Sequence, residues 1–117
     1  MFFHMHELSL AMSLVELAES ETIRSGSTAI ISVDVLIGRL AGIDPEALKF
    51  MLDLSKKNTL LDHAFINFEL VNGKGRCRAC HSEFPVDTLA PVCPGCHGIS
   101  IEVTGGDELR IVSMEVE

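Results

Sequence analysis

Apolar residues recur with a helical period near the start of the chain. Between Glu7 and Arg24, polar side chains return along one face and leave the other face broad and apolar. The apolar face consists of Leu8, Ala11, Met12, Val15 and Ala18, flanked by Leu10, Leu14 and Leu17. Gly26 follows, and glycine readily adopts the left-handed conformation that ends a helix. The pattern predicts an amphipathic helix over 7–24.

The next segment changes to a period of two, which is typical of a strand. Apolar and mostly β-branched residues run through 29–37, and Val33, Val35 and Ile37 alternate with Asp34 and Leu36. This pattern predicts a buried strand that ends at Gly38.

A second helix is predicted by the signal at its start. The Asp44 carboxylate can accept hydrogen bonds from the first N–H groups, and Pro45 needs no donor at the first helical position. Glu46 suits the positive end of the helix dipole. The helix is expected to run to about Lys57. Its inner face would carry Leu48, Met51 and Leu52, with Ala47 and Leu54 beside them.

Two more strands, over 65–71 and 109–116, complete the predicted fold. We expect an α/β fold, with two helices on a small three-stranded mixed sheet and an inserted module. The predicted domains are an α/β domain of residues 1–72 and 106–117 and the module of residues 73–105. Glycines at both ends of the module predict breaks in the chain, and so a module that can hinge.

Composition and charge narrow the class of protein. A chain of 117 residues allows one small domain with an appendage, and without Trp or Tyr its core must be largely aliphatic. The net charge of −8 disfavours binding to nucleic acid or to anionic lipid. No apolar run approaches the ~20 residues of a membrane span, and residues 1–10 lack the cationic segment of a signal peptide. We expect a soluble cytoplasmic protein with no membrane partner.

The four cysteines are the strongest chemical signal. Cys77 and Cys80 form one Cys-x-x-Cys pair, Cys93 and Cys96 form another, and 12 residues separate the pairs. Two such turns can present four thiolates to one tetrahedral ion, which predicts a zinc ribbon with short strands over 84–86 and 99–104. So small a module has too few apolar side chains to fold alone, so metal is expected to be a condition of its folding.

Other interpretations of the cysteines are weaker. A redox role needs a free dithiol near a βαβ unit, and two matched pairs are better explained by a shared metal. His81 and His97 complete two c-type haem patterns, but two haems would crowd 33 residues. The simplest interpretation of these histidines is exposed polar residues on the two turns. The alternative is that either one replaces a thiolate as zinc ligand under changed pH.

Three features together resemble the HypA/HybF family of hydrogenase nickel-incorporation proteins. They are the Met5-His6-Glu7 start, the segment from Arg39 to Leu48 that contains Gly-Ile-Asp-Pro-Glu-Ala-Leu, and the paired cysteines. The resemblance extends from Met5 to the closing segment around Ile111. It implies a nickel metallochaperone that delivers Ni(II) to the large subunit of [NiFe] hydrogenase, together with a GTPase of the same pathway.

The resemblance also implies which residues hold each metal. His6 would be the principal nickel ligand, Glu7 its neighbour in the site and Asp44 a further oxygen donor, while the four cysteines would hold structural zinc. The chemistry is reasonable, because nitrogen and oxygen donors in tetragonal geometry suit Ni(II) and thiolates suit zinc. His63 is most simply interpreted as a loop residue.

The donor set of the nickel site depends on whether the chain begins at Met5 or at Met1. If the chain begins at Met5, its free amine, the His6 backbone nitrogen and the His6 imidazole form fused chelate rings with nickel. If it begins at Met1, that amine is lost, and His4 can add an imidazole instead. The resemblance favours the Met5 start.

No nucleophile is paired with a base and no glycine-rich phosphate loop occurs, so we expect a carrier without catalysis of its own. The competing interpretation is a zinc-ribbon adaptor that binds protein or nucleic acid and never handles nickel. The sequence leaves open whether the chain forms a homodimer, and whether it also serves urease.

Overall fold

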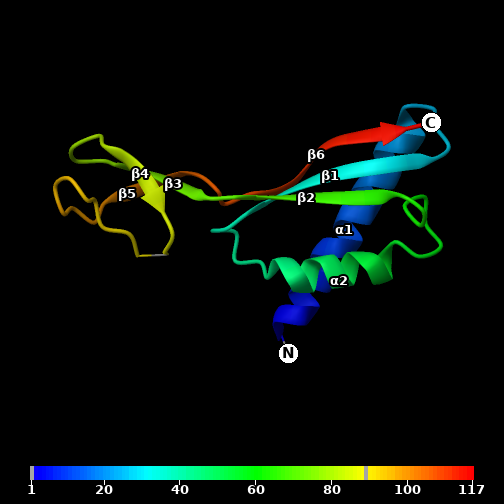
Figure 1. The fold of residues 1–117 in the computed structure, drawn as a ribbon, viewed down its shortest axis with the longest axis horizontal. Helices are drawn as coiled ribbons and strands as arrows, with labels where there is room; N and C mark the ends of the chain where they lie inside the picture. Colours follow the sequence, from blue (N-terminus) through cyan, green and yellow to red (C-terminus); the bar gives the residue numbers. More distant parts are fainter. Residues whose placement is uncertain (1, 89) are drawn as a thin grey trace. The chain divides into compact units, whose positions relative to one another are not determined.

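The computed structural model describes residues 2–88 and 90–117, with side chains from His6 onward, and divides into two compact units. The helical unit contains residues 2–36, Ile43–Glu69 and Arg110–Glu117. The ribbon unit contains Ile37–Gly42 and Leu70–Leu109. Figure 1 shows α1 and α2 within the helical unit and β3, β4 and β5 within the ribbon unit. The predicted fold class, two helices on a small sheet with an inserted cysteine module, is confirmed.

The first helix, α1, spans Phe2–Arg24 and therefore begins earlier than the predicted start at Glu7. No glycine or proline stands before Glu7 to stop it. Its buried apolar face consists of Ala11, Leu14, Val15 and Ala18. The predicted face was too wide, because Leu8, Met12 and Leu17 are exposed. None of the helices in the described residues is long and apolar enough to cross a membrane.

The second helix, α2, spans Pro45–Ser55, slightly shorter than predicted. Its predicted cap is confirmed, since the Asp44 side chain accepts hydrogen bonds from the N–H groups of Glu46 and Ala47. Of the predicted inner face, Ala47, Leu48 and Leu52 are buried, Met51 is half-buried and Leu54 is exposed.

The sheet of the helical unit has the strand order β2-β1-β6. Its strands are β1 (Ile30–Gly38), β2 (Phe65–Val71) and β6 (Leu109–Val116), close to their predicted bounds. The Thr28 N–H donates to the Glu117 carbonyl, and the Gly38 N–H donates to the Glu108 carbonyl. Because the start of β1 thus meets the end of β6, the two strands run antiparallel. Strands β1 and β2 run in the same direction (Figure 1), which makes the sheet mixed as predicted.

The ribbon unit is built on a strand that the sequence pattern does not predict. Gly73-Lys74-Gly75 was interpreted as a chain break, but it opens β3 (Gly73–Cys77), the central strand of a second sheet. Strands β4 (Glu83–Val86) and β5 (Ile101–Gly105) pair with it antiparallel on either side. Glycine is needed at Gly75 because a Cβ there would crowd the side chains of Val86 and Ile101. The missing side chain therefore reflects close packing across the strands.

Candidate metal sites

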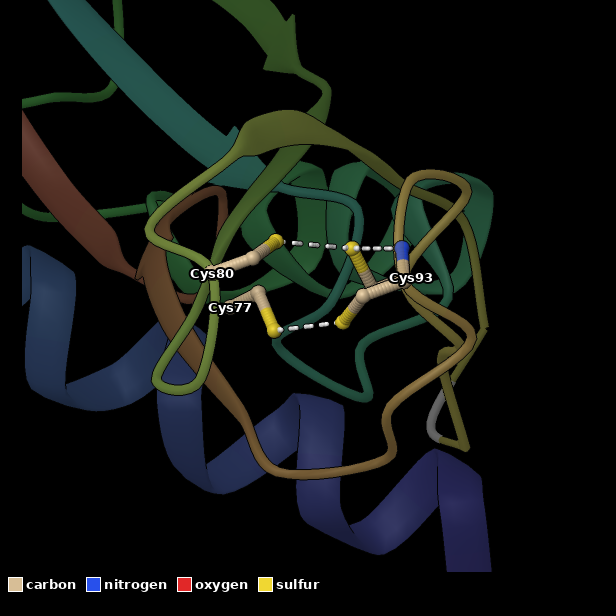
Figure 2. A group of neighbouring side chains, drawn as sticks. Cys77, Cys80 and Cys93 are labelled. Carbon is tan, nitrogen blue, oxygen red and sulfur yellow. Dashed lines mark hydrogen bonds between the residues drawn. The ribbon is translucent and has the colours of Figure 1, made fainter.

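The four cysteine side chains converge in the ribbon unit, as predicted. Their sulfur atoms all lie within 4.8 Å of one another. The Sγ atoms of Cys77 and Cys96 are 3.5 Å apart, and those of Cys80 and Cys93 are 3.6 Å apart. Figure 2 shows these cross-turn approaches. With zinc–sulfur bonds of about 2.3 Å, a tetrahedral site places its sulfurs close to these separations.

Backbone hydrogen bonds shape the two cysteine turns in the same way. The N–H of His81 donates to the Cys77 carbonyl, and the N–H of His97 donates to the Cys93 carbonyl, each at 2.9 Å. The N–H groups of Gly95 and Cys96 also point at the Cys93 sulfur, at 3.4 and 3.5 Å. Amide donors of this kind favour a thiolate over a thiol, so the turns are built for metal-bound sulfur.

The pKa values of the clustered thiols are shifted in opposite directions. Hydrogen bonds from the Ser82 hydroxyl and backbone, followed by Cys93, lower the pKa of Cys80 to about 6. The Gly98 N–H also favours the Cys96 thiolate, but the neighbouring sulfurs of Cys77 and Cys80 together with burial raise its pKa to about 12. Four thiolates this close cannot all ionise unless a positive ion offsets their repulsion. The residues therefore fit a divalent metal ion.

The two histidines that follow the cysteine pairs lie on the surface. His81 and His97 both have a left-handed backbone, with φ of 66° and 64°, and both are exposed. The His81 Nδ1 atom lies 3.3 Å from a guanidinium nitrogen of Arg76. Among the described residues, the metal-ligand cluster consists of the four cysteines alone. An alternative ligand role for either histidine stays a prediction.

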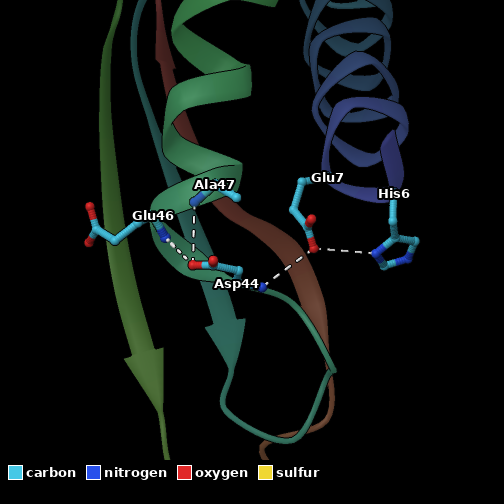
Figure 3. Close-up of polar contacts among 5 residues, drawn as sticks. All are labelled: His6, Glu7, Asp44, Glu46 and Ala47. Atoms are coloured by element: carbon cyan, nitrogen blue, oxygen red, sulfur yellow. Dashed lines mark hydrogen bonds and ion pairs between the residues drawn. The ribbon is translucent and has the colours of Figure 1, made fainter. Parts of the chain in front are cut away.

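The candidate nickel residues meet where the two helices begin. Glu7 is fully buried, and its Oε1 atom accepts a hydrogen bond from the Asp44 N–H at 3.4 Å. The same oxygen is 3.5 Å from Nδ1 of His6, whose side chain is half exposed. Figure 3 shows Glu7 between His6 and the Asp44 backbone, at the first turn of α2. The fold thus brings His6, Glu7 and Asp44 together across 37 residues of sequence.

The two oxygens of the Glu7 carboxylate differ in their hydrogen bonding. Its Oε2 atom is buried and has no hydrogen-bond partner among the described residues. An unpaired buried carboxylate oxygen is costly, so a donor or a cation at this position would stabilise the folded protein. Sequence reasoning gave Glu7 only as implied by the family resemblance. The sequence does not predict its burial, because no local pattern distinguishes it from the other glutamates of α1.

The Asp44 side chain is directed elsewhere. Its Oδ1 atom accepts the N–H groups of Glu46 at 3.0 Å and Ala47 at 3.4 Å. Only its backbone N–H is directed at Glu7 (Figure 3). The side chains of His4 and Met5 lie outside those that the structure describes, and His63 is exposed in the loop after α2.

Comparisons with known proteins agree with one another. Residues 5–116 match the family model described as "Hydrogenase/urease nickel incorporation, metallochaperone, hypA". The chain is 42% identical over 113 residues to the hydrogenase maturation factor HypA of Geobacter sp. (strain M21), covering 97% of this chain and all of that one. It is 38% identical to the HypA of Pelodictyon phaeoclathratiforme, covering 97% of each chain.

A solved structure has the same fold. The solution structure of the Ni metallochaperone HypA from Helicobacter pylori superposes with a TM-score of 0.71 at 25% sequence identity, and the alignment covers 94% of this chain and 96% of that one. The likeness therefore extends over both units.

Proposed function

The chain belongs to the HypA family of nickel-incorporation metallochaperones for hydrogenase maturation, and from this premise we propose that it binds Ni(II) at the start of α1 and releases it to an acceptor. His6 is the principal ligand, and the buried Glu7 carboxylate orients it. The observation that carries this proposal is the unpartnered Glu7 oxygen beside the half-exposed His6.

The Glu7–His6 contact supports a defined role for each side chain. Metal-bound histidines commonly donate their other ring N–H to a carboxylate, which orients the imidazole and raises its basicity. With Nδ1 of His6 held by Glu7, the Nε2 atom is the one directed at an ion. The side chain of His6 is 53% exposed, so the ion can enter and leave from solvent. An exchangeable site of this kind suits a carrier better than a closed one does.

The two possible starts of the chain give different donor sets. In the chain that includes Phe2–Met5, the His6 N–H lies inside α1, where the helix uses it for its own hydrogen bonding. The imidazoles of His6 and His4 and the carboxylates of Glu7 and Asp44 are then the candidate donors. A chain that begins at Met5 has a free amine there and an unused His6 N–H, so it can form the fused chelate rings.

We assign zinc to Cys77, Cys80, Cys93 and Cys96. All four tetrahedral positions are filled by protein sulfur, so this ion is structural and is not passed on. When bound, it supplies cross-linking and charge compensation and no reaction chemistry. His81 and His97 remain candidates for alternative zinc ligands when protonation of a thiolate weakens its bond.

The proposed role includes partners and a compartment. The cargo goes to the large subunit of [NiFe] hydrogenase in the cytoplasm, with a GTPase of the pathway supplying any nucleotide hydrolysis. The chain itself has no catalytic step in this scheme. Urease is a second acceptor to test, because the matching family model names both hydrogenase and urease.

Nickel titration of the zinc-loaded protein tests the proposal. We expect His6→Ala to bind Ni(II) at least about tenfold more weakly than the unmodified chain, while the matched control His63→Ala binds as before. Both chain starts, at Met1 and at Met5, are titrated in parallel. Equal binding by His6→Ala and the unmodified protein, or no binding by any form, would favour the zinc-ribbon adaptor instead.

A further inference from the structure

The four cysteines of the ribbon unit differ in their exposure to solvent. Cys80 and Cys96, the second cysteine of each turn, are exposed, whereas Cys77 and Cys93 are buried. Each of the two short sulfur–sulfur approaches joins an exposed sulfur to a buried one. The Cys80 sulfur lies 3.6 Å from that of Cys93, and the Cys96 sulfur lies 3.5 Å from that of Cys77. Both approaches run between the turns (Figure 2), and we call them the cross-turn pairs.

Each cross-turn pair has the arrangement of a redox-sensitive pair of thiols. Cysteines that respond to oxidants are accessible to solvent and lie beside a second cysteine that reacts with the oxidised one. An oxidant from solvent reaches the exposed sulfur first, and the buried sulfur beside it is protected from direct attack. Metal binding keeps all four sulfurs as thiolates, which are the nucleophilic form. Both members of each pair are therefore ready to react.

We propose that hydroperoxides convert the metal cluster into two cross-turn disulfides and so release the zinc. One bond joins Cys80 to Cys93, and the other joins Cys96 to Cys77. The inference rests on the assignment of zinc to the four cysteines and not on nickel binding at His6. It concerns the response of the metal site to an oxidant, and catalytic disulfide exchange is not part of it.

Each disulfide forms in two steps. The exposed thiolate attacks the hydroperoxide, so that an S–O bond forms, the O–O bond breaks and the departing oxygen takes up a proton. The buried thiolate then attacks the sulfenic sulfur, so that the S–S bond forms, the S–O bond breaks and the departing hydroxide takes up a proton to give water. The two sulfurs lose two electrons, which the hydroperoxide gains. When both bonds have formed, no thiolate is left to hold the ion.

Cross-turn bonds and bonds within one Cys-x-x-Cys turn have different consequences. The cross-turn bonds join residues that are 13 and 19 positions apart, and they tie the two turns together as the shared ion does. Bonds within each turn would leave the two turns unlinked. A disulfide that closes a longer loop constrains the unfolded chain more strongly. We therefore expect the oxidised ribbon unit to stay folded without zinc, unlike the ribbon unit from which the metal is chelated.

Oxidation of the full zinc-loaded chain by hydrogen peroxide tests the proposal. Zinc content is measured first, and zinc release is then followed with a coloured chelator while mass spectrometry of alkylated, digested samples identifies the disulfides. We expect the two cross-turn bonds to account for most of the disulfide and to appear together with free zinc. The control is the zinc-free chain oxidised in denaturant, where bonds within each turn should dominate because short loops close most readily.

Gly98 offers a variant that leaves every metal ligand in place. A Cβ at this position would lie 3.2 Å from the Cys96 sulfur and 3.7 Å from the Cys77 sulfur. Gly98→Ala therefore shields one cross-turn pair and leaves the other as an internal control. Relative to the Cys80–Cys93 bond, the Cys77–Cys96 bond should form at least about twofold more slowly than in the unmodified chain.

Two further measurements separate this proposal from the carrier role. NMR spectra of the oxidised, zinc-free chain should keep the chemical-shift dispersion of residues 73–105. Nickel titration should give the same affinity before and after oxidation, because His6 takes no part in the reaction. A reduced chain that binds no nickel would defeat the carrier role and leave the disulfide proposal intact.

Several results would overturn the proposal. They are bonds within each turn or between two chains as the main products of native oxidation, and sulfinic acids at Cys80 and Cys96 without disulfide. Zinc that stays bound through the oxidation would also overturn it. So would a ribbon unit that unfolds although both cross-turn bonds have formed. A purified chain without zinc would instead contradict the zinc assignment, which the measurement before oxidation detects.

Discussion

The helical unit and the ribbon unit are stabilised by different means. The helical unit buries an aliphatic core of some size, in which Leu48, Leu52, Val33 and Val35 are at most 2% exposed. In the ribbon unit, few apolar side chains are buried, and the fully buried ones are Ile37, Cys77 and Cys93. One unit can rely on the hydrophobic effect, and the other depends on what its sulfur atoms bind.

The same contrast separates the two proposed metal sites. The ribbon sulfurs form a closed set that suits a permanent ion, and the residues at the start of α1 form an incomplete set with a buried oxygen left over. A closed set of ligands suits a structural ion, whereas an incomplete set suits an ion that is exchanged. In the proposed role, this difference lets one small chain hold one ion and transfer another.

The largest expected effect comes from removing the metal of the ribbon unit. Because structural zinc contributes about 10–16 kcal/mol of apparent binding free energy, chelation should unfold the ribbon unit while α1 and α2 persist. NMR spectra before and after chelation measure this effect. We expect the resonances of residues 73–105 to lose their chemical-shift dispersion and those of residues 7–55 to keep it. An equal loss in both regions would show that the helical unit also depends on zinc.

The converse change acts on the helical unit. Leu48 is fully buried, so Leu48→Ala should lower the free energy of unfolding by about 2–5 kcal/mol through lost burial and a cavity. Urea denaturation followed by helix circular dichroism measures it, while the zinc content of the ribbon should not change. The control Phe50→Ala, at an exposed position of the same helix, should cost far less. Zinc loss in Leu48→Ala would contradict the independence of the two units.

A smaller effect separates the two interpretations of Asp44. Asp44→Ala removes the helix cap and should destabilise the helical unit by about 1 kcal/mol. Asp44→Ser keeps a capping oxygen but removes the carboxylate, so it should restore most of that stability. Since the observed side chain caps α2, we expect Asp44→Ser to bind nickel like the unmodified chain. A clear loss of nickel affinity in Asp44→Ser would make the carboxylate a ligand.

The smallest effect concerns the sheet of the helical unit. The Ser113 hydroxyl, at 2.7 Å, and then the Asn67 amide hold the pKa of Asp34 below its usual value of 3.8. Ser113→Ala should move this pKa back toward 3.8, as an NMR titration of the Asp34 carboxyl would measure. Because a lowered pKa stabilises the ionised folded form, the contribution of the bond is present above pH 3.8 and is lost as pH falls through the folded pKa. A pKa unchanged by Ser113→Ala would refute the role of the hydroxyl.

Strong local signals predicted much of this protein correctly. Asp44-Pro45 located the start of α2 because a cap and its helix are adjacent in sequence. The two Cys-x-x-Cys pairs located the metal cluster because each turn brings its own two sulfurs together. The β-branched period of two located β1 for the same reason, since neighbouring residues define it.

Tertiary structure decided the features that depend on distant residues. Leu8 and Met12 share the helical period of the core but face solvent, because the neighbouring elements cover only part of α1. The sequence around Gly73 and Gly75 predicts a break in the chain, whereas in the folded protein this segment is a strand paired with β4 and β5. The burial of Glu7 against the Asp44 N–H arises only when two helix starts meet in the folded chain, and no pattern within either segment encodes that encounter.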